Sequence, residues 1–244
     1  MICKIADCLC DSCTYDIRKI FILGSFWLLI FVYIGNMMEQ SLYIDNLSTL
    51  LQALSTVQKK QPLLIGIDGR PGSGKTTVAI KLEEALHAQA IYLDEFFIPQ
   101  EQWPKDAKPQ FPFFYFRYQE FVEGVKALAS GKPFSYFTYD WETNGLSKQV
   151  KVINPEGIII VEGVSALNAE LAPLYDKRIW VASDHTSEFA AIASRENEKN
   201  LDLWKNIYLP SVEIYCKQKP WQQADIIYAG RGIESQEQLE KALK

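Results

Sequence analysis

Short apolar runs alternate along the chain with segments whose apolar residues recur every three or four positions. Runs of the first kind predict buried strands, and segments of the second kind predict amphipathic helices. The predicted strands are residues 62–68, 90–93, 157–161, 178–182 and 224–228. Two further predicted strands, 133–139 and 149–153, belong to an inserted segment. The predicted helices are residues 48–58, 77–86, 118–129, 187–217 and 235–244. This alternation predicts an α/β fold in which helices cover both faces of a central, mostly parallel sheet.

A glycine-rich octet connects the first strand to the helix that follows it. It reads Gly69-Arg70-Pro71-Gly72-Ser73-Gly74-Lys75-Thr76 and fits the phosphate-loop pattern G-x-x-x-x-G-K-[ST]. Glycines allow successive backbone N–H groups to converge on one point, and a helix N-terminus adds partial positive charge. We therefore expect the octet and the adjoining Thr77 to bind the phosphates of ATP. Lys75 would contact the β- and γ-phosphates, and the Thr76 hydroxyl would ligate Mg²⁺.

Two carboxylates follow predicted strands, at the sheet edge where parallel α/β proteins bind ligands. Transfer of a phosphoryl group from ATP to a hydroxyl group of an acceptor molecule needs a base that takes the proton of that hydroxyl. Asp94 is the candidate base. It comes directly after strand 90–93, which we expect to neighbour the phosphate-loop strand. Glu95 is its rival, and a capping role is the structural alternative for Asp94. Glu162 follows strand 157–161 and is expected to hold Mg²⁺ through water, because this ion keeps several water ligands.

The long helical region and the loop after strand 90–93 supply further candidates. Arg195 is the candidate cation that would bind the transferred phosphate and stabilise its negative charge. A surface ion pair of Arg195 with Glu196 or Glu198 is an equal alternative. The loop is crowded with aromatic residues, namely Phe96, Phe97, Phe113, Phe114, Tyr115, Phe116 and Tyr118. These rings could stack against a flat substrate or form the small core of the loop.

Composition narrows the function classes. The 244 residues are 48% hydrophobic and 23% charged, which suits one α/β domain with a full-sized core. Thirty acidic residues against 25 basic ones give a net charge of −5, and no lysine- or arginine-rich stripe occurs. Nucleic acid is therefore a poor candidate partner. We expect a small-molecule acceptor instead, and the sequence leaves a homo-oligomer open.

The N-terminal segment differs from the rest of the chain. From Ile20 to Met38 no charged residue occurs, and such a stretch could span a membrane as a helix. Basic residues precede this stretch and acidic residues follow it, an arrangement that would send the phosphate-loop domain outside the cell, away from ATP. We therefore expect no working membrane anchor and a cytoplasmic protein.

Cysteine usage also separates the two parts of the chain. Four of the five cysteines lie in the N-terminal segment, at Cys3, Cys8, Cys10 and Cys13, and their spacing fits no common zinc pattern. We interpret residues 1–37 as a hydrophobic, cysteine-containing leader and residues 38–244 as the phosphate-loop domain. Our hypothesis is that the native protein starts at Met37 or Met38.

Five short segments of the chain, taken together, form a further pattern. They are Ile67 to Thr77, Tyr92-Leu93-Asp94-Glu95-Phe96-Phe97, Tyr139-Asp140-Trp141, Ile159-Ile160-Val161-Glu162-Gly163, and Lys219-Pro220 through Ala224-Asp225-Ile226-Ile227. Together they resemble the phosphoribulokinase/uridine kinase family of P-loop kinases, especially its small bacterial uridine kinase-like members. The resemblance implies a three-layer P-loop kinase fold with a helical lid. It also implies ATP- and Mg²⁺-dependent phosphorylation of a hydroxyl on a small molecule, with a nucleoside as the leading acceptor.

The same resemblance implies roles for individual residues. Asp94 stands in the position of the acceptor-side base, and Phe97, Tyr139 and Asp140 stand near the acceptor. The helical region 187–217 stands in the position of the lid.

Two departures from the family pattern keep other acceptors open. The lid face reads Glu188, Ala191 and Arg195 where the family often carries several arginines, and residues 114–118 replace its H-P-x-x-F-D element. Pantothenate- or sugar-type acceptors therefore remain alternatives to a nucleoside. A P-loop protein that binds ATP with weak turnover is a further alternative.

The leader hypothesis predicts the N-terminus of the protein made in its native host. Mass spectrometry of that protein is expected to find Met37 or Met38 at its start. Peptides from residues 1–36 would refute the hypothesis.

Overall fold

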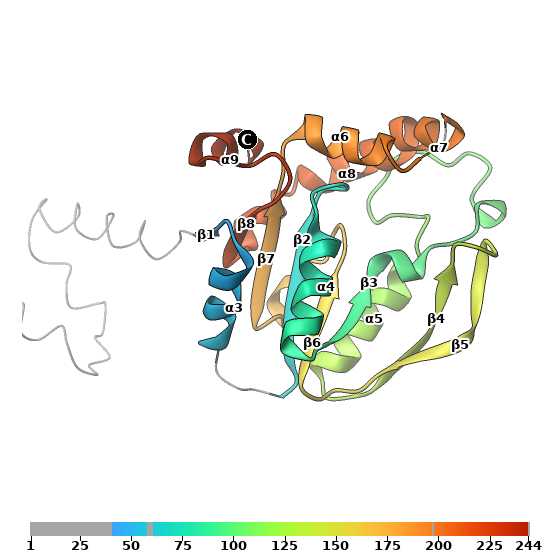
Figure 1. The fold of residues 1–244 in the computed structure, drawn as a ribbon. Coiled ribbons are helices and arrows are strands. Elements are labelled where there is room, and N and C mark those ends of the chain that lie inside the picture. Colours follow the sequence, from blue (N-terminus) through green and yellow to red (C-terminus); the bar gives the residue numbers. More distant parts are fainter. Residues whose placement is uncertain (1–40, 58–60, 197, 244) are drawn as a thin grey trace, which may run out of the picture. The chain divides into compact units, whose positions relative to one another are not determined.

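The structure is a computed structural model that describes residues 41–57, 61–196 and 198–243. The leader predicted for residues 1–37 lies outside these residues. A six-stranded sheet with the order β1-β8-β7-β2-β6-β3 forms the centre, and all its strand pairs are parallel (Figure 1). The strands are β1 Leu42–Ile44, β8 Ile226–Ala229, β7 Lys177–Ala182, β2 Leu63–Gly69, β6 Ile158–Glu162 and β3 Gln89–Tyr92. The predicted α/β fold is confirmed.

Helices cover both faces of the sheet and create two hydrophobic cores. Helices α3 (Leu47–Ser55) and α4 (Lys75–Leu86) pack on one face, and α5 (Tyr118–Ala129) and α8 (Leu209–Cys216) pack on the other. Successive side chains of a strand point to opposite faces. In β6, for example, Ile160 joins the core under α4, whereas its neighbours on both sides join the core under α5. Both faces are buried, which explains why the strands are apolar apart from residues near their ends.

The position of β3 corrects one expectation. We expected the strand before Asp94 to neighbour the phosphate-loop strand, and this expectation is wrong. Strand β2 pairs with β7 on one side and with β6 on the other, so β3 pairs with β6 at the edge of the sheet. Glu162, the last residue of β6, therefore lies between the phosphate-loop strand and the segment that carries Asp94.

A separate hairpin and a set of helices complete the domain. Strands β4 (Phe134–Asp140) and β5 (Gly145–Ile153) form an antiparallel pair outside the main sheet (Figure 1). The chain ends with helix α9 (Gln236–Ala242). Among the residues described, no helix combines the length and apolar character needed to cross a membrane.

The long helical region predicted for residues 187–217 is interrupted in the structure. It consists of α6 (His185–Ala193), α7 (Glu198–Leu203), a π-helical turn (Trp204–Tyr208) and α8, which we call together the lid helices. Pro210 stands at the start of α8. It has no N–H for the usual bond to the fourth preceding carbonyl, which accounts for the wider turn immediately before it.

Candidate functional site

The phosphate loop lies between β2 and α4, as its sequence predicts. Gly72 has a φ of +78°, and a Cβ at this position would lie 2.6 Å from the carbonyl oxygen of Glu188 in α6. Gly74 has a φ of +99°, and a Cβ there would meet no atom within 4 Å. The first glycine thus allows the loop to pack against a lid helix, and the second leaves open space at the N-terminus of α4. Open space beside unpaired N–H groups suits an anion.

Three side chains converge at the start of α4. The Lys75 Nζ lies 3.8 Å from Glu162 Oε1, and the Thr76 hydroxyl donates to the same oxygen at 3.3 Å. The Glu162 residue is only 2% exposed. Burial raises the pKa of this carboxyl group, and the charge of Lys75 opposes that rise. A cation placed here would stabilise the ionised form further.

The donor set at this point fits a magnesium ion. Magnesium prefers oxygen ligands and is usually held by one or two carboxylates together with substrate phosphates and water. Thr76 and Glu162 supply a hydroxyl and a carboxylate oxygen side by side. In the described part of the chain, no cluster of three or more His, Cys, Asp or Glu side chains is arranged to hold a metal alone. The observed pair therefore suits an ion shared with a bound nucleotide.

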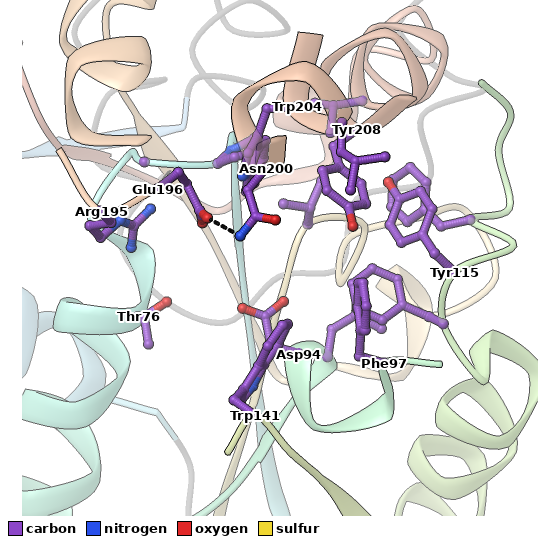
Figure 2. Close-up of a pocket in the computed structure, with 18 of the residues that line it drawn as sticks. Thr76, Asp94, Phe97, Tyr115, Trp141, Arg195, Glu196, Asn200, Trp204 and Tyr208 are labelled. Carbon is purple, nitrogen blue, oxygen red and sulfur yellow. Dashed lines mark hydrogen bonds between the residues drawn. The ribbon is translucent and has the colours of Figure 1, made fainter. Parts of the chain in front are cut away.

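A cavity of about 690 Å³ extends from the phosphate loop towards the loop after β3. Its aromatic wall consists of Phe97, Phe113, Tyr115, Phe116, Tyr139, Trp141, Trp204 and Tyr208. Figure 2 shows Thr76 and Arg195 at one end of this pocket, Tyr115 and Phe97 at the other, and Asp94 between them. Most of the phosphate loop thus shares one pocket with the predicted acceptor residues Asp94, Phe97 and Tyr139.

The structure distinguishes Asp94 from its rival Glu95. Both belong to a 3₁₀ turn, Leu93–Phe96, directly after β3. Asp94 is exposed and lines the pocket. Glu95 instead accepts hydrogen bonds from Lys151 Nζ at 2.7 Å and from the Tyr136 hydroxyl at 2.5 Å. These two partners belong to the hairpin, so Glu95 ties the turn to β4 and β5 while Asp94 faces the pocket.

The Tyr139-Asp140-Trp141 segment splits between two environments. Tyr139 and Trp141 line the pocket, and the Tyr139 hydroxyl donates to Asn144 Oδ1 at 3.0 Å. Asp140, which we expected near the acceptor, is absent from the pocket lining. Its carboxylate accepts from the Thr143 hydroxyl at 2.8 Å and from the Glu142 N–H at 2.9 Å. Short-range bonds to the next residues are typical of Asp in turns, so Asp140 shapes the hairpin turn.

Comparison with known proteins identifies the family. The sequence pattern of the Phosphoribulokinase / Uridine kinase family matches residues 64–199, which is more than half of the 244 residues. The chain belongs to this family. As a member it is a small-molecule kinase, which confirms the enzyme class that its motifs predict.

Individual relatives agree with this assignment. The chain is 29% identical over 170 residues to a uridine kinase of Limosilactobacillus reuteri, a match that covers 66% of this chain and 78% of the relative. It is 32% identical over 131 residues to a uridine kinase of Staphylococcus epidermidis, covering 51% of this chain and 63% of that protein. A solved structure described as a possible uridine kinase from Bacillus stearothermophilus superposes with a TM-score of 0.59, covering 75% of this chain and 96% of that one. At 20% identity, the structural match shows a shared fold.

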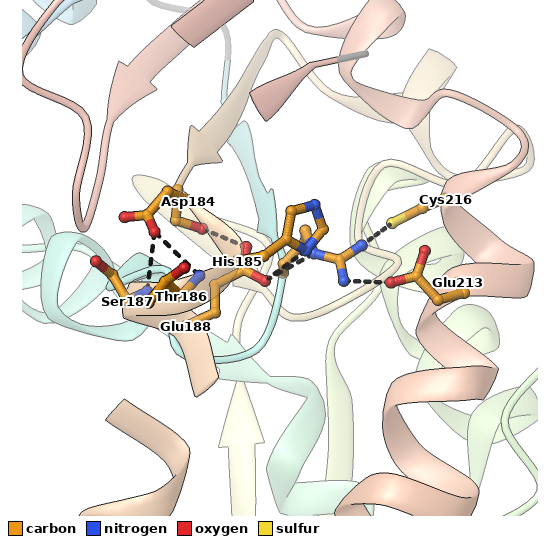
Figure 3. A network of polar contacts seen from close by, with 9 residues as sticks. Asp184, His185, Thr186, Ser187, Glu188, Glu213 and Cys216 are labelled. Atoms are coloured by element: carbon orange, nitrogen blue, oxygen red, sulfur yellow. Dashed lines mark hydrogen bonds and ion pairs between the residues drawn. The ribbon is translucent and has the colours of Figure 1, made fainter. Parts of the chain in front are cut away.

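Within this family fold, the Arg70 side chain leaves the phosphate loop and enters a buried network. We expected Arg70 to bind the nucleotide, but its guanidinium is directed towards the lid helices. Its Nε donates to Glu188 Oε2 at 2.8 Å, and its Nη2 donates to Glu213 Oε1. Figure 3 shows Glu188, Glu213 and Cys216 around this guanidinium. The arginine therefore ties the phosphate loop to α6 and α8 at once.

Asp68, near the end of β2, makes a second connection to helix α8. Its carboxylate is fully buried and accepts from the backbone N–H groups of Ser165 at 3.1 Å and Leu167 at 2.8 Å. The Tyr215 hydroxyl of α8 donates to it at 2.6 Å. Burial outweighs these bonds and raises the pKa of Asp68 to about 6. Asp68 thus joins the phosphate-loop strand, the segment after β6 and the lid helix α8.

Several pocket residues were not among the predicted site residues. Arg231 follows β8 at the carboxyl edge of the sheet, and its Nε donates to the Gly72 carbonyl oxygen at 2.9 Å. A basic residue three positions after a predicted strand is a signal that could have found it. Trp204 and Tyr208 both enter the pocket from the π-helical turn. A continuous helix predicted from periodicity gives no reason to select these two.

The Arg70 network generates a stability prediction. Replacing Arg70 with Met leaves the 2%-exposed Glu188 without its main charge partner. Breaking a buried ion pair in this way costs about 3–5 kcal/mol of unfolding free energy, which urea denaturation would measure. The matched control is Lys126→Met, because the pair between Lys126 and Glu170 is exposed and should contribute at most ~1 kcal/mol. Equal losses in the two variants would contradict the structural role of Arg70.

Proposed function

We propose that this chain is an ATP- and Mg²⁺-dependent kinase that phosphorylates a hydroxyl group of a nucleoside. The observation that carries the proposal is the single pocket in which the phosphate loop, the exposed Asp94 and an aromatic wall meet. Flat rings suit a nucleobase, since aromatic pairs prefer stacked or edge-to-face contacts. The uridine kinases among its relatives support the same acceptor class. We propose the cytoplasm as the location, because ATP is available there.

The proposed donor site is residues 69–77. The backbone N–H groups at the start of α4 would bind the phosphates, and the Lys75 ammonium would stabilise the negative charge on the transferred phosphoryl group. Thr76 and Glu162 would hold Mg²⁺, with Glu162 acting through water. The bound ion would neutralise part of the phosphate charge. Arg195, two residues after the last residue of α6, lines the same end of the pocket and would add a second cation.

The proposed acceptor site is the recess lined by Asp94, Phe97 and Tyr139. Asp94 would accept the proton of the attacking hydroxyl, because in the described structure its carboxylate lines the pocket and forms no ion pair. Phe97 packs edge-on against Tyr139 with ring centroids 5.2 Å apart, which makes a rigid wall for the acceptor. Rigid placement of the hydroxyl beside the phosphate contributes much of the catalysis of phosphoryl transfer.

Removal of the phosphate-loop lysine tests the donor site. Lys75→Ala should lower turnover by about 10²-fold or more, because a charge that stabilises the transition state is lost. The control is Lys81→Ala, which removes an exposed lysine from the same helix outside the pocket. ADP release with ATP and a nucleoside panel gives the rates. Unchanged turnover in Lys75→Ala would refute the assignment of the donor site.

Neutralisation of Asp94 tests the acceptor site. Asp94→Asn should lower kcat by about 10²–10⁴-fold, as expected for the loss of a general base. Nucleotide affinity, measured by calorimetry, should stay nearly unchanged. Asp140→Asn is the matched control, because Asp140 lies in the hairpin turn outside the pocket. A normal rate in Asp94→Asn would show that another group accepts the proton.

A further inference from the structure

The charges around the pocket are distributed unequally. Among the described residues that line it, the cations are Lys75, Arg195 and Arg231. All three are associated with the phosphate loop or with the helix packed against it. Lys75 begins α4, Arg231 Nε bonds to the Gly72 carbonyl oxygen at 2.9 Å, and Arg195 Nε bonds to the carbonyl oxygen of Ala191 in α6 at 3.1 Å. The positive charge of the pocket thus gathers where phosphates would bind.

The lining of the pocket also carries carboxylates. Besides Asp94, its lining includes Glu101, from the loop after β3, and Glu196, from the segment between α6 and α7. Within the described residues neither glutamate forms an ion pair, and Glu196 Oε2 accepts a hydrogen bond from Asn200 Nδ2 at 2.9 Å (Figure 2). An acceptor that enters the pocket would therefore meet carboxylates that no ion pair neutralises in the described structure.

The charges of both glutamates act on tyrosine side chains that line the same pocket. Burial is the main cause that raises the pKa of Tyr139, and the charge of Glu101 adds to it. Burial likewise raises the pKa of Tyr208, and the charge of Glu196 adds to it. Both carboxylates line the same pocket as these two rings.

The aromatic wall, like the carboxylates, disfavours an anionic ligand. The ring centroids of Tyr139 and Trp141 are 4.8 Å apart, and those of Tyr115 and Tyr208 are also 4.8 Å apart. Trp141 is 60% exposed and lines the pocket, so part of its surface is free for a ligand. The face of an aromatic ring carries partial negative charge and attracts cations. Rings and carboxylates together disfavour an anion and tolerate a neutral or positively charged group.

We propose that Glu101 and Glu196 are specificity-determining residues that reject anionic acceptors. The alcohol phosphorylated in this pocket would then be an uncharged or cationic molecule with a flat aromatic group. Placing like charges together is an established means of excluding wrong ligands. This inference rests on the proposed kinase function and deepens it, because it separates nucleoside-type acceptors from acceptors that carry a carboxylate or a phosphate.

The test uses three acceptors that differ in one charge. Uridine, 5-carboxyuridine and 5-aminomethyluridine share the same ribose and ring but are neutral, negative and positive at neutral pH. The carboxylate derivative should show a kcat/KM about 10-fold or more below that of uridine, because like charges repel across the recess. The aminomethyl derivative should equal or exceed uridine. The difference should shrink at high salt, since salt screens exposed charges.

Variants assign the selectivity to the two glutamates. Relative to uridine, the double variant Glu101→Gln/Glu196→Gln should use the carboxylate derivative about 10-fold more efficiently than the unmodified protein does, as measured by kcat/KM. Glu142→Gln is the control, because Glu142 is an exposed glutamate of the hairpin turn that does not line the pocket. It should leave the ranking of the three acceptors unchanged. An unchanged ranking in the double variant would overturn the role of the glutamates.

Binding of the same three compounds, followed by tryptophan fluorescence, separates two kinds of failure. Equal affinities and equal rates for all three would overturn the charge inference and leave the kinase proposal standing. The predicted ranking in binding without phosphorylation would support the charge inference and refute nucleoside phosphorylation. Absence of both binding and phosphorylation would overturn both.

Discussion

Two buried charges beside the phosphate loop constrain the whole domain. Asp68 and Arg70 stand on either side of Gly69 at the end of β2, and both are buried. A buried charge is costly unless partners surround it, and here several of the partners come from the lid helices. Asp68 accepts from Tyr215 at 2.6 Å, and Arg70 pairs with Glu188 at 2.8 Å. The ion pairs of Arg70 therefore form only when α6 and α8 are docked against the phosphate loop.

This docking completes the pocket. The phosphate loop supplies one end of it, and the segment after β3 supplies the middle. The turn after α6 supplies Arg195, and the lid helices supply Trp204 and Tyr208. Strand order sets the spacing between the first two parts, because β6 separates β2 from β3. Glu162, at the end of β6, lies beside Lys75. Burial raises the pKa of its carboxyl group, and the charge of Asp94 adds to that rise. One buried carboxyl thus stands between the two segments that a phosphoryl transfer must bring together.

The aromatic residues after β3 serve two purposes that their sequence does not separate. Phe96 is fully buried and stacks on Tyr136 at 4.5 Å, which joins the 3₁₀ turn to the hairpin. Phe97 and Tyr115 also belong to the core, but they line the pocket as well. The two interpretations of the aromatic cluster, substrate stacking and a small core, therefore apply to different faces of one cluster. A firm core behind the pocket wall keeps the recess in shape.

The sequence alone determined the parts of this protein that depend on local chemistry. Apolar runs and helical spacing predicted the parallel sheet and its covering helices, and helix α5 occupies the predicted residues 118–129. The octet from Gly69 to Thr76 predicted the phosphate loop, because its glycines and its lysine act within a few residues of each other. These signals involve residues that are close together in the sequence, so they can be recognised from the sequence alone.

The tertiary structure decided everything that depends on which distant segments meet. It put β3 at the sheet edge, turned Glu95 to Lys151 while Asp94 faces the pocket, and used Asp140 in a turn. It also took the Arg70 side chain from the phosphate loop into a buried network with two helices. Each of these polar side chains, Glu95, Asp140 and Arg70, is of a type that can bond to several kinds of partner. Strand order and helix docking selected one of them, and neither is encoded in residue spacing.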